Sequence, residues 1–150
     1  MVGGWFWAFF FTIAIFFGSI FVDTQHQLTA NNIVGEASAI SGNMMVYRNA
    51  VSTYAQSNPG STGTVADASL PLPSWYTKIS GVSNYVTGGK GYVYYSNQRP
   101  ELAYQLLKDT NNTMLSGIKR SGVLYNPISG TSSISIPSAI PDESVVYGDG

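Results

Sequence analysis

The hydrophobic pattern of the chain begins with an apolar run from Val2 to Val22 that contains no charged side chain. As a helix, this run is about 31 Å long, which matches the hydrocarbon thickness of a bilayer. It lacks the basic start and the small-residue cleavage site of a secretory signal. We therefore predict an uncleaved transmembrane anchor over residues 1–22. Its anchoring side chains are Trp5, Trp7, Phe10, Ile13, Phe17 and Phe21.

The charges beside this run predict its orientation. No Lys or Arg follows the anchor until Arg48, which makes translocation of that flank inexpensive. We expect a single-pass protein of the bacterial inner membrane, with its N-terminus in the cytoplasm and its C-terminal domain in the periplasm. The alternative is a buried core helix, but the remaining chain is too small to cover an apolar helix of this length.

A second apolar pattern precedes Asn58-Pro59-Gly60, which ends a helix because the residue before a proline avoids the helical conformation. Apolar side chains recur there at alternating steps of four and three residues, the period of an amphipathic helix. They are Ile33, Ala37, Ile40, Met44, Tyr47, Val51 and Tyr54. We predict a stalk helix over residues 23–58. Its apolar stripe packs either on the C-terminal domain of the same chain or on other copies in a homo-oligomer.

A stripe of small residues lies on the same predicted helix. Gly35 and Gly42 are its glycines, and each costs about 1 kcal/mol relative to alanine in a helix interior. With Ser38 and Ala39 they form pairs of small residues four apart, which allow two helices to approach closely. The alternative is a locally weak, bendable helix that has no partner on this side.

Residues 59–150 alternate between turn residues and short β-rich segments. Two hairpins are predicted, and Gly88-Gly89-Lys90-Gly91 forms the turn of the first. We also expect short strands near the C-terminus, a short helix in "SWYTKISGV" and a helix that starts at Pro100. The predicted fold class is α+β and pilin-like in layout, with a transmembrane helix that continues into a long amphipathic helix packed on a small antiparallel sheet. This third segment, 59–150, is a small α+β domain.

Composition excludes several functions. Seven basic and eight acidic residues give a net charge of −1, so no basic surface for nucleic acid is expected. The chain has no cysteine and one histidine, which removes disulfides and the usual zinc ligand sets. We find no nucleophile motif with a histidine partner. We therefore predict no catalytic residues, cofactor, metal or small-molecule substrate, and no enzyme activity.

Several phrases resemble one family. They are "VYRNAVSTYAQSNPGSTGTVADASLPLPSWY", "GVSNYVTGGKGYVYYS", "LAYQLLKD", "SGIKRSGVLYNP" and "IPSAIPDESVVYGD". In this order they resemble the PilM proteins of plasmid-encoded type IVB, or conjugative, pilus systems. The resemblance covers nearly all of the chain beyond residue 45. It implies a small bitopic inner-membrane component of the pilus base or of the machinery that transports pilins.

Three hypotheses for the function remain open at this point. In the first, the protein is a non-enzymatic scaffold of pilus assembly whose periplasmic domain contacts other assembly proteins or pilins. In the second, it is a minor pilin or a pilin-like subunit of the filament. In the third, its tyrosine-rich surface binds peptidoglycan.

Overall fold

A computed structural model describes residues 32–97, 99–111 and 113–149. Contacts within the chain define two compact units, Met1–Gly35 and Glu36–Gly150. Apart from residues 32–35 at the start of the first helix, the architecture below is that of the second unit. A helix covers residues 32–57 and is called the long helix here. It is followed by η1 (Asp67–Ser69), β1 (Val82–Thr87), β2 (Lys90–Tyr95), α2 (Pro100–Asp109), β3 (Ser116–Arg120), β4 (Val123–Asn126), β5 (Gly130–Ser135) and β6 (Val145–Gly148).

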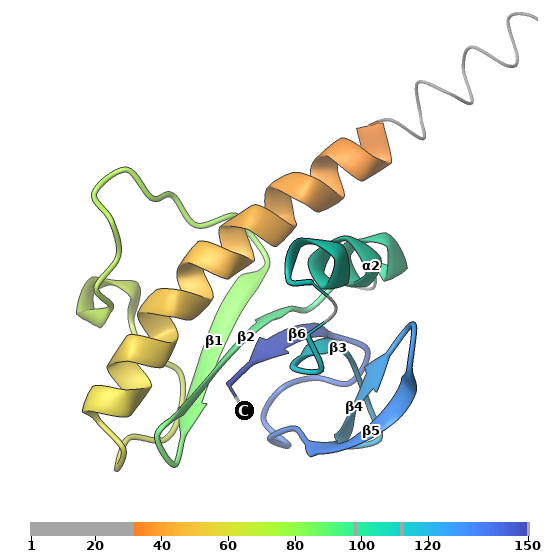
Figure 1. The fold of residues 1–150 in the computed structure, drawn as a ribbon. Coiled ribbons are helices and arrows are strands. Elements are labelled where there is room, and N and C mark those ends of the chain that lie inside the picture. The colour runs from red at the N-terminus through yellow and green to blue at the C-terminus, as the bar shows by residue number, and fades with distance from the viewer. Residues whose placement is uncertain (1–31, 98, 112, 150) are drawn as a thin grey trace, which may run out of the picture. The chain divides into compact units, whose positions relative to one another are not determined.

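The six strands form one antiparallel sheet in the order β1-β2-β6-β3-β4-β5 (Figure 1). The last strand of the chain, β6, lies in the middle and pairs with both β2 and β3. An ion pair of 2.5 Å between Arg48 and Asp149 ties its end to the long helix. Asp149 also accepts a hydrogen bond of 2.8 Å from the backbone N–H of Gly91 in β2. The residue after β6 is therefore held by both the long helix and β2.

The long helix and α2 cover one face of the sheet. Their buried side chains join alternate residues of the strands in the main core, for example Val93 of β2 and Val145 of β6. The long helix comes close to the sheet at Gly91, where a Cβ atom would lie 3.0 Å from the Ser52 nitrogen and from Val51 Cγ1. Only glycine leaves enough room for this approach without a shift of the helix.

The other face of the sheet carries a second, smaller core. Tyr92 and Val146 point to this side, as expected because neighbouring strand residues face opposite sides. Ile136 and Ile140, from the segment after β5, pack against them and are almost fully buried. Both faces of the sheet are thus covered by apolar contacts.

Both edge strands of the sheet, β1 and β5, depart from regular strand pairing. At the β1 edge, Gly63 and Val86 exchange two backbone hydrogen bonds of 2.9 Å, so part of this edge is paired. At the β5 edge the register against β4 shifts, and the Ser132 hydroxyl takes the place of a regular backbone bond to Leu124. Such irregularities are typical of sheet edges that are protected from pairing with another chain.

The predicted fold class and location need correction. None of the helices in the described ranges is long and apolar enough to cross a membrane. The long helix is amphipathic, because Arg48 and Asn49 interrupt its apolar residues. In the described ranges the fold is a six-stranded antiparallel sheet with two α-helices. It gives no support to the pilin-like layout on a membrane helix or to the single-pass inner-membrane location. The predicted anchor over residues 1–22, from Trp5 to Phe21, lies outside the described residues.

Several local elements agree with their sequence signals and one does not. The first hairpin turns at Gly88 and Gly89, which have positive φ values of 57° and 76°, whereas Lys90 and Gly91 belong to β2. The helix predicted to start at Pro100 is α2. The short helix predicted in residues 74–82 is wrong, because this segment is a turn followed by extended chain that leads into β1.

Candidate functional site: a clamped loop that presents Trp75

The residues of the predicted apolar stripe occupy different environments along the long helix. Five of them are buried, and four of these belong to the main core of the same chain. Tyr54 is half-buried at the margin of that core, and Ile33 is 39% exposed. The buried members are Ala37, Ile40, Met44, Tyr47 and Val51. From Ile40 to Val51 the stripe is therefore a contact within one chain.

The two glycines of the predicted small-residue stripe have open surroundings among the described residues. Gly35 and Gly42 are exposed, and no atom lies within 4 Å of the position that a Cβ atom would take at either glycine. The structure thus brings no second helix to these two positions.

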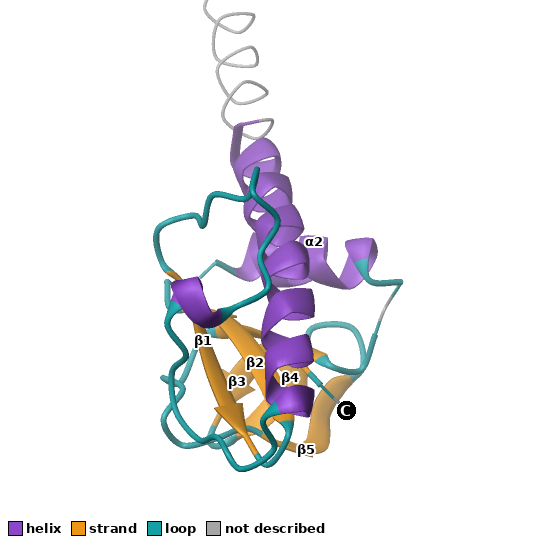
Figure 2. Ribbon diagram, turned by 90° about the vertical axis from the view of Figure 1, so that its left-hand side faces the viewer, coloured by secondary structure: helices purple, strands orange, loops and turns teal. Residues whose placement is uncertain are grey.

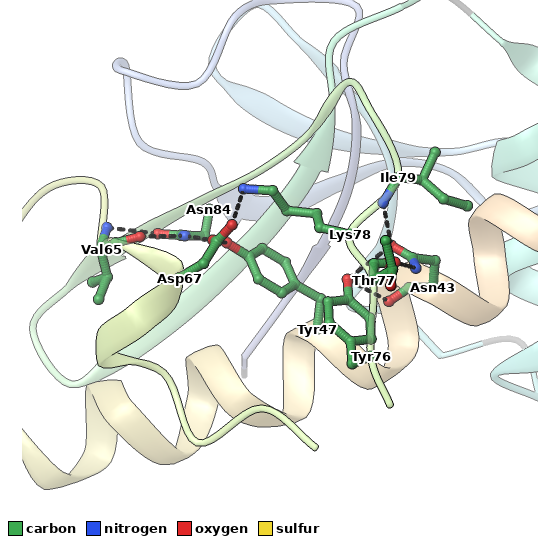
Figure 3. A network of polar contacts seen from close by, with 9 residues as sticks. All are labelled: Asn43, Tyr47, Val65, Asp67, Tyr76, Thr77, Lys78, Ile79 and Asn84. Atoms are coloured by element: carbon green, nitrogen blue, oxygen red, sulfur yellow. Dashed lines mark hydrogen bonds and ion pairs between the residues drawn. The ribbon is translucent and has the colours of Figure 1, made fainter. Parts of the chain in front are cut away.

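Tyr47 is the centre of a polar network that joins the long helix, β1 and the loop of residues 58–81 (Figure 3). Its hydroxyl donates a short hydrogen bond to the carboxylate of Asp67 in η1. It also accepts a bond of 2.7 Å from the side-chain amide of Asn84, which is buried in β1. The same Asn84 side chain holds both the N–H and the carbonyl of Val65 at 2.8 Å. A buried polar side chain in a strand is costly unless it is fully bonded, and here its partners are all in place.

A second set of contacts fixes the other end of the same loop. Tyr76 stacks on Tyr47 with ring centroids 5.8 Å apart and its hydroxyl donates a bond of 2.8 Å to the Asn43 side chain. Asn43 also accepts a bond from the N–H of Ile79 at 3.1 Å and donates one to the Thr77 carbonyl at 2.8 Å. One helix residue thereby satisfies three groups of the loop.

An ion pair closes the network between these two sets of contacts. Lys78 Nζ lies 2.6 Å from the carboxylate of Asp67 and 5.3 Å from the centre of the Tyr47 ring. Partial burial alone would raise the pKa of Asp67, but the hydrogen bonds from Lys78 and Tyr47 outweigh it and hold that pKa below its ordinary value. Asp67 is therefore ionised at neutral pH and attracts both partners.

The two stacked tyrosines are protonated at neutral pH. Burial, followed by the hydrogen bond to Asp67, raises the pKa of Tyr47 far above its ordinary value. Burial, followed by the charge of Asp67, raises the pKa of Tyr76 to about 12. Both hydroxyls thus serve as hydrogen-bond donors, and what the arrangement achieves is to hold the loop in one conformation.

The loop of residues 58–81, which these contacts hold in one conformation, presents Trp75 to solvent. This side chain is 72% exposed, although its neighbours in the loop, Leu70 and Leu72, turn inward and pack on the main core. The indole meets the ring of Tyr76 edge to face at 6.4 Å. Figure 2 shows η1 and the loop beside the long helix. An exposed tryptophan on a fixed support is the kind of side chain that contributes most to protein interfaces.

Sequence reasoning missed this site almost completely. It placed Tyr47 in the apolar stripe but gave no role to Asn43, Asp67, Lys78 or Asn84. One signal was available, since an asparagine between Val82 and Val86 on the buried side of a strand requires partners. Within the described residues, no group of three or more His, Cys, Asp or Glu side chains is arranged to hold a metal.

By its fold, the described part of the chain is a small domain in which a long helix and a short one lie on an antiparallel sheet of six strands. The chain belongs to the PilM family, because the family model described as PilM matches residues 11–148. The recognition made from the sequence phrases is thereby confirmed.

Two solved structures are similar to this chain. A PilM protein from Escherichia coli B7A is 23% identical with a TM-score of 0.57, and the match covers 77% of this chain and 92% of that one. A PilM protein from Pseudomonas aeruginosa 2192 is 30% identical with a TM-score of 0.48, and the match covers 77% of this chain and 96% of that one. The first similarity supports the fold. Among curated proteins, a search finds no significant match.

Proposed function

We propose that this chain is a non-enzymatic assembly component of a type IVB pilus system and that it binds another pilus-assembly protein through Trp75. Membership of the PilM family supports a role connected with pili and their assembly proteins. The observation that carries the binding role is the exposure of Trp75, at 72%, on a loop held by hydrogen bonds to Asn84 and Asn43.

The contacts of Asn43, Tyr47 and Asn84 that hold the loop, called the clamp here, explain why this surface suits binding. Ordering a loop on association costs conformational entropy, and a loop that is already held in one conformation avoids most of that cost. Asn43, Tyr47 and Asn84 provide this preorganisation from two elements of regular structure. Lys78 is the one charged side chain in residues 70–80, and it is paired with Asp67. The partner surface is therefore expected to be largely apolar.

The test is purification of the tagged full-length chain from piliated cells, with the bound pilus proteins quantified by mass spectrometry. Trp75→Ala is expected to lower the affinity of the partner about thirtyfold, because truncation of a central aromatic residue commonly costs about 2 kcal/mol. Tyr104→Ala is the matched control, since Tyr104 is another large exposed aromatic residue, 55% exposed, on α2. Surface pili are counted in the same strains.

Equal recovery of pilus proteins with Trp75→Ala and with Tyr104→Ala, in variants with unchanged circular dichroism, would contradict the binding role of Trp75. Recovery of the chain as a regular subunit of sheared pili would contradict the assembly role and favour a pilin-like subunit instead.

A further inference from the structure

A shallow pocket of about 330 Å³ lies between the C-terminal half of the long helix and the first part of the loop. Tyr54 of the long helix and Val86 of β1 line it, and the rest of its lining comes from residues between Ser61 and Ser69. No residue of the segment that presents Trp75 takes part. The pocket is thus a separate feature of the molecule, at the small end of the range for ligand pockets.

The lining of this pocket is rich in hydroxyl groups and carries no charged side chain. Ser61, Thr62, Thr64 and Ser69 contribute hydroxyls, and Tyr54 adds an aromatic ring with a phenol. Thr62, Thr64 and Ser69 are exposed to solvent, and the hydroxyl oxygen of Thr62 lies 3.5 Å from that of Thr87. Each such hydroxyl can both donate and accept a hydrogen bond.

The backbone that forms the pocket is held in place. Gly63 is paired with Val86 through two bonds of 2.9 Å, and its φ of 124° is a conformation that favours glycine. Two residues further on, both backbone groups of Val65 are bound by the buried Asn84 side chain. Thr64, the residue between these two attachment points, is therefore held in place and presents its hydroxyl on a preformed stretch of backbone.

We propose that this pocket binds a neutral saccharide. A ligand here meets hydroxyl groups and one aromatic ring but no charge to pair with an ionic group. The hydroxyls of a sugar match such a lining, and aromatic side chains such as Tyr54 suit the partly positive C–H bonds of a sugar ring. The volume admits a short part of a sugar chain. This inference does not depend on the role proposed for Trp75.

The test is saturation-transfer NMR on the full-length chain, with N,N′,N″-triacetylchitotriose, called chitotriose here, and maltotriose as separate probes. Both are neutral, but only chitotriose carries the acetamido groups of cell-wall glycans. Thr64→Val keeps the shape of the side chain and removes one hydroxyl, so we expect it to weaken binding about threefold or more. Thr131→Val is the matched control, because Thr131 is an exposed threonine on β5 outside the pocket. Tyr54→Phe tests the phenol separately from the ring.

Transfer to either probe that falls in Thr64→Val and persists in Thr131→Val supports the proposal. Binding of chitotriose alone assigns the pocket to acetamido sugars, and binding of both assigns it to neutral sugars in general. The proposal is overturned if neither probe receives saturation, or if Thr64→Val and Thr131→Val bind equally well. None of these outcomes bears on pilus-protein binding by Trp75.

Discussion

Two stripes of the long helix, both predicted from residue spacing, have opposite environments. Met44 and Val51 on the apolar stripe are fully buried against the sheet of the same chain. Gly42, on the small-residue stripe, faces open space. Both stripes lie on one helix, but only the contacts show which one has a partner within the chain. The comparison teaches that a periodic pattern predicts a surface and not what covers it.

The largest loss of stability is expected when a charge is placed on the buried stripe. Met44→Asp removes a fully buried side chain, which alone costs about 2–5 kcal/mol, and buries a carboxylate without a partner. Because this loss approaches the total stability of a typical domain, we expect Met44→Asp to be unfolded. Circular dichroism and thermal unfolding measure it.

Gly42→Asp is the control for Met44→Asp, since it places the same charge on the open stripe. We expect the Gly42→Asp variant to fold with a free energy of unfolding within about 0.5 kcal/mol of the unchanged chain. A folded Met44→Asp with an unchanged melting temperature would show that the apolar stripe is not part of this core and would restore the intermolecular alternative.

A smaller loss of stability is expected at Gly91, a glycine of β2 that lies against the buried side of the long helix. Gly91→Ala places a methyl group 3.0 Å from the Ser52 nitrogen and from Val51 Cγ1, so the long helix must shift outward. Overpacking of this kind costs about 1–3 kcal/mol. Urea unfolding measures the difference, with Gly60→Ala as the control because nothing lies within 4 Å of its Cβ position. Equal stability of the two variants would mean that the helix does not rest on β2 at this point.

The smallest expected effect is an increase in stability. Gly42→Ala fills open space on an exposed helix position, so we expect stabilisation by up to about 1 kcal/mol from the higher helix propensity of alanine. Thermal unfolding should show a rise in the melting temperature of a few degrees. A lower melting temperature would disagree with the open environment of Gly42. Loss of pili in a stabilised Gly42→Ala variant would favour a close helix partner from another protein.

Local signals predicted the elements whose geometry depends on neighbouring residues. Two adjacent glycines allow the tight turn at Gly88 and Gly89, and proline is favoured at the first position of a helix, as at Pro100. The clamp around Tyr47 had no such local signal. Its hydroxyl meets Asp67, which is 20 residues away, and Asn84, which is 37 residues away. The segment around Trp75 was wrongly predicted as helical for the same reason, because its contacts to Asn43 decide its course.

The sequence by itself determined the period of the long helix, the first hairpin and the start of α2, because the conformational preferences of nearby residues decide these features. The tertiary structure decided that β6 enters the centre of the sheet and that Gly91 lies under the long helix. It also decided that Trp75 stands exposed on a loop whose residues Val65 and Asp67 are bonded to the buried side chains of Asn84 and Tyr47. These features depend on contacts between residues far apart in the chain, and the energy of such contacts is decided only when the fold brings both partners together.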